Sequence, residues 1–264
     1  MGCASLRPPV APPGNPVSDI IHRLDGSVWQ VEINRPERAN ALRRTTMREI
    51  EAVLDSAETS AADATGVLLT GGLERFSAGA DLSEMTGTVD DLGFDNELEQ
   101  LCQRLTLSPL PLVAAVEGAC YGAAVDLVWA CDAAVVSEEA RIGLPSTSLG
   151  ILYNPSSVAR LHARLGSSTV RRLMVLQQEL SGRELPPGTA TVVRSGSAVE
   201  TAGSLLSTLA ADSAATAATK ELLASLDRGD GFDPAVWQPE REARLASPAR
   251  HAALEARRAA INRD

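Results

Sequence analysis

The sequence has few of the residues that hold metal ions or form disulfides. It contains three histidines and four cysteines, and no two cysteines form a C-x-x-C pair. Cys102, Cys120 and Cys131 lie inside apolar stretches, where cysteine usually serves as a small buried residue. We therefore predict neither a metal site nor a disulfide.

Long apolar runs and an excess of positive charge are also missing. The chain has 34 acidic and 24 basic residues, a net charge of −10 that repels nucleic acid and anionic membrane surfaces. The first 16 residues contain no apolar run long enough for a signal peptide or a membrane span. Leu6 occupies the position where the N-terminal myristoylation pattern requires Ser or Thr. These absences predict a cytoplasmic protein that binds neither nucleic acid nor membranes.

What is present is enough apolar material for one main core. The 264 residues are 44% hydrophobic and 22% charged, as in a globular chain. The first 16 residues include five prolines and predict a disordered leader. We expect a core domain over residues 17–198 and a C-terminal helical region over residues 199–264.

The pattern of apolar residues predicts alternating strands and helices. Residues 27–34 alternate as a half-buried strand does, and residues 45–57 have helical spacing. Residues 66–70 and 112–116 are short apolar runs of the kind found in buried parallel strands. This order predicts an α/β domain whose ligands meet the loops that follow the strands.

Two such loops consist of small residues. Residues 75–82 follow one buried strand, and residues 117–127 lead from another into an apolar helix, whose first N–H groups suit a developing oxyanion. Small residues after a strand more often mark tight packing, so neither loop alone predicts a site.

Taken in order, the segments of the chain resemble the crotonase (enoyl-CoA hydratase/isomerase) superfamily. The resemblance covers about two thirds of the chain and rests on INRPERANAL (residues 33–42), FSAGADL (76–82), PLVAAVEGACYGAAVDLVWACD (111–132), LGILYN (149–154) and LSGRE (180–184). It implies an α/β, crotonase-like spiral of ββα turns with a C-terminal helical trimerisation region, and therefore a homotrimer or hexamer. It also implies an acyl thioester substrate, on CoA or on an acyl-carrier protein, with no cofactor beyond the coenzyme A of the substrate.

The resemblance carries over residue by residue to a site. It places the thioester oxygen between the backbone N–H groups of Ala80 and Ala123, which form an oxyanion hole. Substrate contacts are implied for five further residues, Ala78, Leu82, Pro145, Ser146 and Asn154.

The two positions that hold glutamates in hydratases are occupied by Asp126 and Ser146. A serine hydroxyl without an activating partner is neither a useful acid nor a useful base near neutral pH. This disfavours the paired-carboxylate hydratase mechanism and the isomerases that use a single glutamate at the position of Ser146.

The segment LGILYN is similar to the corresponding part of methylmalonyl-CoA decarboxylases. There the residue matching Tyr153 orients the substrate carboxylate, so the resemblance names Tyr153 and Asp126 as catalytic. Loss of carbon dioxide forms the enolate directly and needs no strong base. The structural alternative for Tyr153 is an amphipathic residue with a solvated hydroxyl.

The sequence thus favours a lyase that decarboxylates a malonyl- or methylmalonyl-type thioester. One alternative is an enoyl-CoA hydratase, dehydratase or isomerase that uses Asp126 alone. Another is a catalytically silent protein that binds acyl thioesters, since Ala123 and Ser146 depart from the family pattern.

Two further features depart from, or add to, this pattern. After Glu184 a shorter, proline-containing connection replaces the helix of the family. Four arginines, Arg35, Arg38, Arg43 and Arg44, lie on the loop that in the family is near the adenosine end of CoA. They either pair with phosphates or balance neighbouring glutamates.

Overall fold

The structure, a computed structural model, describes residues 18–60, 64–209, 212–228 and 232–261. The predicted leader over residues 1–16 lies outside this part of the chain.

Two sheets organise the described chain. The larger sheet has the order β1-β2-β3-β5-β7-β10, in which β1 is antiparallel and the other strands are parallel. The smaller sheet has the order β4-β6-β8-β9, in which β9 is antiparallel. The strands are β1 (Ile20–Asp25), β2 (Val28–Ile33), β3 (Gly66–Thr70), β4 (Arg75–Ser77), β5 (Leu112–Val116), β6 (Ala119–Tyr121), β7 (Ala133–Ser137), β8 (Arg141–Gly143), β9 (Leu180–Ser181) and β10 (Thr191–Val193).

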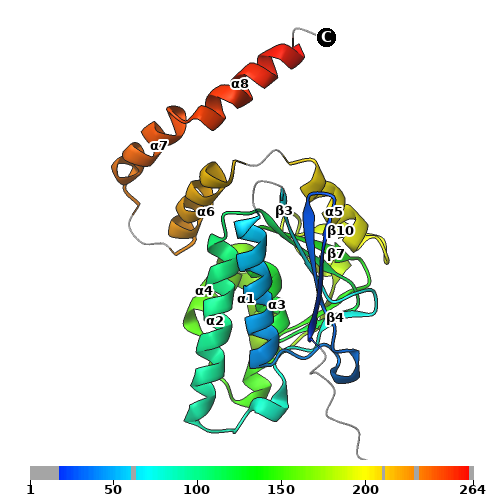
Figure 1. The fold of residues 1–264 in the computed structure, drawn as a ribbon. Helices are drawn as coiled ribbons and strands as arrows, with labels where there is room; N and C mark the ends of the chain where they lie inside the picture. Colours follow the sequence, from blue (N-terminus) through cyan, green and yellow to red (C-terminus); the bar gives the residue numbers. More distant parts are fainter. Residues whose placement is uncertain (1–17, 61–63, 210–211, 229–231, 262–264) are drawn as a thin grey trace, which may run out of the picture.

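The helices cover both faces of the larger sheet (Figure 1). They are α1 (Arg44–Thr59), α2 (Leu92–Leu107), α3 (Ala123–Ala130), α4 (Pro155–Val170), α5 (Ala198–Ser207), α6 (Ser213–Arg228), α7 (Gln238–Leu245) and α8 (Pro248–Ile261). The helix predicted over residues 45–57 is α1, and the strands predicted over 27–34, 66–70 and 112–116 are β2, β3 and β5.

The strands β3 and β5 are buried on both faces, as their continuous apolar runs predict. In β3, Val67 and Leu69 contribute to the core shared with α1 to α4, whereas Leu68 joins the smaller core under α5. Buried parallel strands of this kind are typical of layered α/β proteins. The predicted α/β class is therefore confirmed.

The C-terminal region does not behave as one unit. Ala198, Ala202 and Leu206 of α5 are buried against the sheet, so α5 packs as part of the core layer. Helices α7 and α8 contain no buried residues and extend away from the body of the molecule (Figure 1).

Helix α6 is fastened to the core by Lys220, the only lysine in the sequence. Its ammonium group donates to the carbonyl oxygens of Leu105 (3.3 Å) and Leu110 (3.1 Å) and pairs with Asp132 (2.8 Å). The side chain is only 6% exposed. One charged side chain thus links α6 to the end of α2 and to the turns that precede β5 and β7.

The connection after residue 184 is short, as predicted. The chain passes from the 3-10 turn Gly182–Glu184 to β10 with no α-helix between them, all within the described residues.

Candidate active site

Two loops of small residues lie against each other at one edge of the smaller sheet. The first follows β4 and the second follows β6, and these strands are parallel neighbours. Gly79 of the first loop has a φ of +91°, and a Cβ there would lie 2.5 Å from the carbonyl oxygen of Tyr121 and 3.3 Å from the amide nitrogen of Ala123. Only glycine allows this approach, so the close contact of the loops explains the residue at this position.

The contact brings together the backbone amides of Ala80 and Ala123. Leu42 donates to the carbonyl of Gly79 and accepts from the amide of Asp81, both at 2.7 Å, so the intervening amide of Ala80 points away from Leu42. Ala123 begins α3, where the first N–H groups have no partner in the helix. Within the described chain neither amide donates a hydrogen bond, so both N–H groups are free.

The predicted substrate-contact residues lie in three segments of the chain. Ala78 and Leu82 are exposed and belong to the loop of Ala80, with Leu82 68% exposed. Pro145 and Ser146 follow β8, which is tied to the second loop by a bond from the Gly122 amide to the Gly143 carbonyl (2.8 Å). The Ser146 hydroxyl is buried without a partner in the described chain.

Asn154 caps helix α4, a role that the sequence analysis did not predict. Its Oδ1 accepts from the amide of Ser156 (3.0 Å), which caps the start of α4, and its Nδ2 donates to Asp95 (3.1 Å). Its side chain therefore orients α4 against α2, and contact with a substrate stays a prediction.

Tyr153 lies with its ring against the core and its hydroxyl buried. No residue of the described chain bonds to that hydroxyl. Burial raises the pKa of Tyr153 well above its ordinary value. The alternative of a solvated hydroxyl is therefore wrong: at neutral pH Tyr153 presents an unused O–H donor.

Asp126 is on α3, one turn after Ala123, and is completely buried. Its Oδ2 is hydrogen-bonded to the Ser157 hydroxyl, and its Oδ1 accepts from Arg160 Nη2 at 2.9 Å. Burial raises the pKa of Asp126, and the charge of Arg160 offsets only part of this effect. A carboxyl group with a raised pKa suits proton transfer near neutral pH.

Three residues of this cluster were missed by sequence reasoning, namely Glu99 on α2 and Ser157 and Arg160 on α4. The only sequence signal is the spacing of Ser157 and Arg160, which places both on one face of a helix. Their pairing with α2 and α3 depends on tertiary structure.

The arginines of residues 35–44 mostly pair with carboxylates. Arg35 is buried and lies 3.0 Å from Asp81 and 3.4 Å from Asp19. Arg43 and Arg44 pair with acidic residues as well, namely Asp19, Glu84 and Glu97. The structure therefore favours the charge-balancing interpretation for these three side chains, although the acidic partners are not the neighbouring glutamates.

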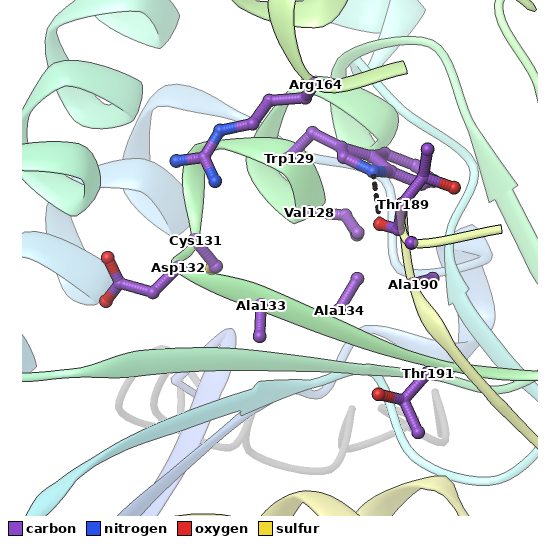
Figure 2. A pocket seen from close by; sticks show the side chains of 11 residues that line it. Val128, Trp129, Cys131, Asp132, Ala133, Ala134, Arg164, Thr189, Ala190 and Thr191 are labelled. Carbon is purple, nitrogen blue, oxygen red and sulfur yellow. Dashed lines mark hydrogen bonds between the residues drawn. The ribbon is translucent and has the colours of Figure 1, made fainter. Parts of the chain in front are cut away.

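A cavity of about 240 Å³ lies at the other end of α3 (Figure 2). It is lined by residues that include Trp129, Arg164 and Thr189, and the Trp129 indole donates to the Thr189 carbonyl (3.3 Å). The helix separates this cavity from the amide of Ala123, so it is distinct from the candidate site.

The described residues contain no group of three or more His, Cys, Asp or Glu side chains placed to hold a metal ion. Among the helices described, none is long and apolar enough to cross a membrane.

Comparison with known proteins relates this chain to a family. A family model described as "Enoyl-CoA hydratase/isomerase" matches residues 23–229. The short-chain-enoyl-CoA hydratase of Clostridium acetobutylicum is 32% identical over 171 residues, 64% of this chain and 65% of that protein. The 2,3-dehydroadipyl-CoA hydratase of Escherichia coli is 31% identical over 168 residues, 64% of this chain and 66% of that protein. The matched segments thus span slightly less than two thirds of these relatives.

Solved structures agree on the fold. A putative enoyl-CoA hydratase/isomerase family protein from Hyphomonas neptunium has a TM-score of 0.75 at 27% identity, covering 85% of this chain and 87% of that chain. An enoyl-CoA hydratase/carnithine racemase from Magnetospirillum magneticum has a TM-score of 0.81 at 20% identity, covering 92% and 93%. The predicted crotonase-like spiral is confirmed, and trimer formation stays a prediction.

Proposed function

The chain belongs to the enoyl-CoA hydratase/isomerase family, and from this premise we propose that it is an enzyme that stabilises the enolate of an acyl-CoA thioester. The observation that carries the proposal is the pair of unpartnered amides, Ala80 and Ala123, in two loops held together at Gly79.

The chemistry follows from the charge that develops on the thioester oxygen. Two N–H donors directed at one oxygen stabilise it most when it carries the negative charge of an enolate. The first turn of α3 adds a partial positive charge at the same place. In other oxyanion holes a single donor is worth about 3 kcal/mol of barrier lowering.

The first candidate reaction is hydration or isomerisation of an unsaturated acyl-CoA, with Asp126 handling the proton. Its support is the set of relatives named above, which are hydratases, and the raised pKa of the buried Asp126. This candidate takes precedence over decarboxylation, which the sequence alone had favoured. Because Ser146 replaces the second carboxylate, Asp126 is the single carboxyl group available for acid–base catalysis at these two positions.

The second candidate is decarboxylation of a malonyl- or methylmalonyl-type thioester. It is favoured by the buried, unpartnered hydroxyl of Tyr153, a donor that a substrate carboxylate would satisfy. The carboxylate would then be held for cleavage, and the same two amides would accept the charge of the enolate. The thioester arm is the same whether it is carried on CoA or on an acyl-carrier protein.

The experiment that separates the candidates is incubation of the purified chain with crotonyl-CoA, malonyl-CoA and methylmalonyl-CoA, followed by mass spectrometry. Gain of one water by crotonyl-CoA supports hydration, and loss of carbon dioxide from either dicarboxylic thioester supports decarboxylation. If all three thioesters bind but none is changed, the chain is a silent thioester binder and the proposal is wrong.

A further inference from the structure

A buried cluster of charged residues joins three helices beside the candidate site. Arg160 of α4 contacts Glu99 of α2 at 2.7 Å and Asp126 of α3 at 2.9 Å, both through Nη2. The Ser157 hydroxyl lies 3.0 Å from Glu99 Oε2 and is also bonded to Asp126 Oδ2. Glu99 is buried and Asp126 completely so.

The hydrogen bonds at Ser157 require one more proton than two ionised carboxylates provide. A serine hydroxyl donates one hydrogen bond and accepts two. Ser157 Oγ accepts from Arg160 Nη2 (3.2 Å) and lies within bonding distance of an oxygen of each carboxyl group. It can donate to only one of them. The second contact is a hydrogen bond only if the other carboxyl group carries a proton.

The charge count leads to the same conclusion. Glu99, Asp126 and Arg160 together carry one excess negative charge when both acids are ionised, and an uncompensated buried charge is costly. A single proton makes the cluster neutral.

Asp126 is the better holder of that proton. Arg160 donates to both oxygens of Glu99, and the Gln103 amide donates to Oε1 at 3.0 Å, so the ionised form of Glu99 is well satisfied. Burial raises the pKa of Glu99, but hydrogen bonds and charge from Arg160 outweigh it and lower the pKa. For Asp126 burial dominates and the pKa is raised.

We propose that Glu99, Ser157 and Arg160 are positioning residues that keep one proton on Asp126 and let it move through the Ser157 hydroxyl to Glu99. In that movement Asp126 gives its proton to Ser157 Oγ while Ser157 gives its own to Glu99. Asp126 loses one O–H bond, Glu99 gains one, Ser157 keeps one, and the cluster stays neutral. This inference deepens the proposed function and rests on it for the use of the proton at the thioester.

Other titratable groups also face Asp126. Cys102 of α2 is buried nearby, and Tyr153 is close enough to interact electrostatically with both Asp126 and Asp95. The Tyr153 hydroxyl is buried and unpartnered. A neutral Asp126 would not repel a substrate carboxylate, and would supply a proton to an enolate carbon.

The proton can be observed without any reaction, by infrared spectroscopy of the full chain at pH 7 in H2O and D2O. We expect the wild type to show the C=O stretch of one protonated carboxyl group, which Asp126→Asn removes. Glu99→Gln should remove it too, because a single carboxylate facing Arg160 stays ionised. Glu97→Gln on the same helix is the matched control and should retain the band. Absence of the band in the wild type, or its persistence in Glu99→Gln, would overturn the inference even if Asp126→Asn does not fold.

The pH profile of turnover provides the second readout. With Asp126 acting as an acid, activity falls as pH rises through its pKa. Glu99→Gln removes a neighbouring negative charge, so this limb should move to lower pH by about 1–3 units, whereas Glu97→Gln should leave it in place. An unmoved limb in Glu99→Gln would contradict the positioning role. If the infrared band is present but no thioester is turned over, the proposed function fails while the shared proton stands.

Discussion

Removal of the backbone N–H of Ala123 is the most direct test of the oxyanion hole. Replacing Ala123 with proline deletes the N–H, and proline is tolerated in the first turn of a helix. We expect turnover of every thioester to fall by about 100- to 1,000-fold, the usual cost of losing one such donor, with native circular dichroism. Ala123→Gly keeps the donor and serves as the control. Wild-type rates in the proline variant would mean that the carbonyl is held elsewhere.

Tyr153 should show opposite effects on stability and on activity. Tyr153→Phe removes a hydroxyl that is buried without a partner, so the free energy of unfolding in urea should stay level or rise by about 1 kcal/mol. If the hydroxyl binds a substrate carboxylate, decarboxylation should slow by roughly ten- to a hundredfold. A marked loss of stability would show that the hydroxyl has a structural partner, and unchanged decarboxylation would remove the role given to Tyr153.

Asp19 should make stability sensitive to acid. Burial raises its pKa, but hydrogen bonds from Arg43 and Thr46 and the charges of Arg43 and Arg35 outweigh this, and the pKa lies below its ordinary value. The stabilisation is therefore complete above the unfolded pKa of about 3.9 and is lost as pH falls through the folded pKa. We expect urea melts between pH 6 and pH 3, taken as roughly the range of carboxyl titration, to show a smaller pH dependence for Asp19→Asn than for the wild type. An Asp19→Asn variant with the same pH dependence as the wild type would contradict this role of Asp19.

The residues of the site differ in how far the sequence could predict them. Ala80 and Ala123 were assigned through the family resemblance, because runs of small residues alone do not distinguish a site from tight packing. The structure brings the two loops that hold them into contact at Gly79. Arg160 and Glu99 could not be located, since their pairing spans 61 positions and depends on how α2 and α4 pack. For Arg35 the sequence left phosphate binding and charge balancing open, and its partner Asp81 could not be identified because it is 46 positions away.

Among the elements, the buried strands were the most predictable. A continuous apolar run such as Gly66–Thr70 is the length of a strand and too short for a typical helix. The helical tail was less predictable. Helix α5 lies within the predicted C-terminal region, yet its apolar face covers the sheet. Helical spacing shows that a face is apolar but does not show which surface it covers.

Helix α6 offers a prediction about docking. Lys220→Met would keep most of the side-chain volume and remove the charged donor to the carbonyls of Leu105 and Leu110. We expect a loss of about 1.5–3 kcal/mol in the free energy of unfolding, typical for hydrogen bonds to a charged group, and faster hydrogen exchange in α6. Glu221→Gln, exposed on the same helix, is the control. Equal exchange rates in both variants would show that α6 is held by its apolar face alone.

For the complete protein, the exposed tail predicts assembly. Helices α7 and α8 contain no buried residues, and Leu245, Leu254 and Ile261 are at least 36% exposed. Short isolated helices are marginal in water, so these gain stability only by packing against another surface. We expect light scattering to show a trimer or a multiple of it. A variant truncated after residue 233 should form assemblies of fewer subunits. A monomeric full-length chain at micromolar concentration would contradict this expectation.

The burial of Lys220 gives the molecule a built-in chemical reporter. Because the sequence has one lysine, a protease that cuts only after lysine has a single site, and an amine-directed acylating reagent has a single side-chain target. That site is sealed against α2 and Asp132 while α6 is docked. The rate of cleavage or labelling in otherwise native buffer therefore measures how often this helix lifts from the core. Unfolding of other regions that leaves α6 in place would go unseen by either reagent.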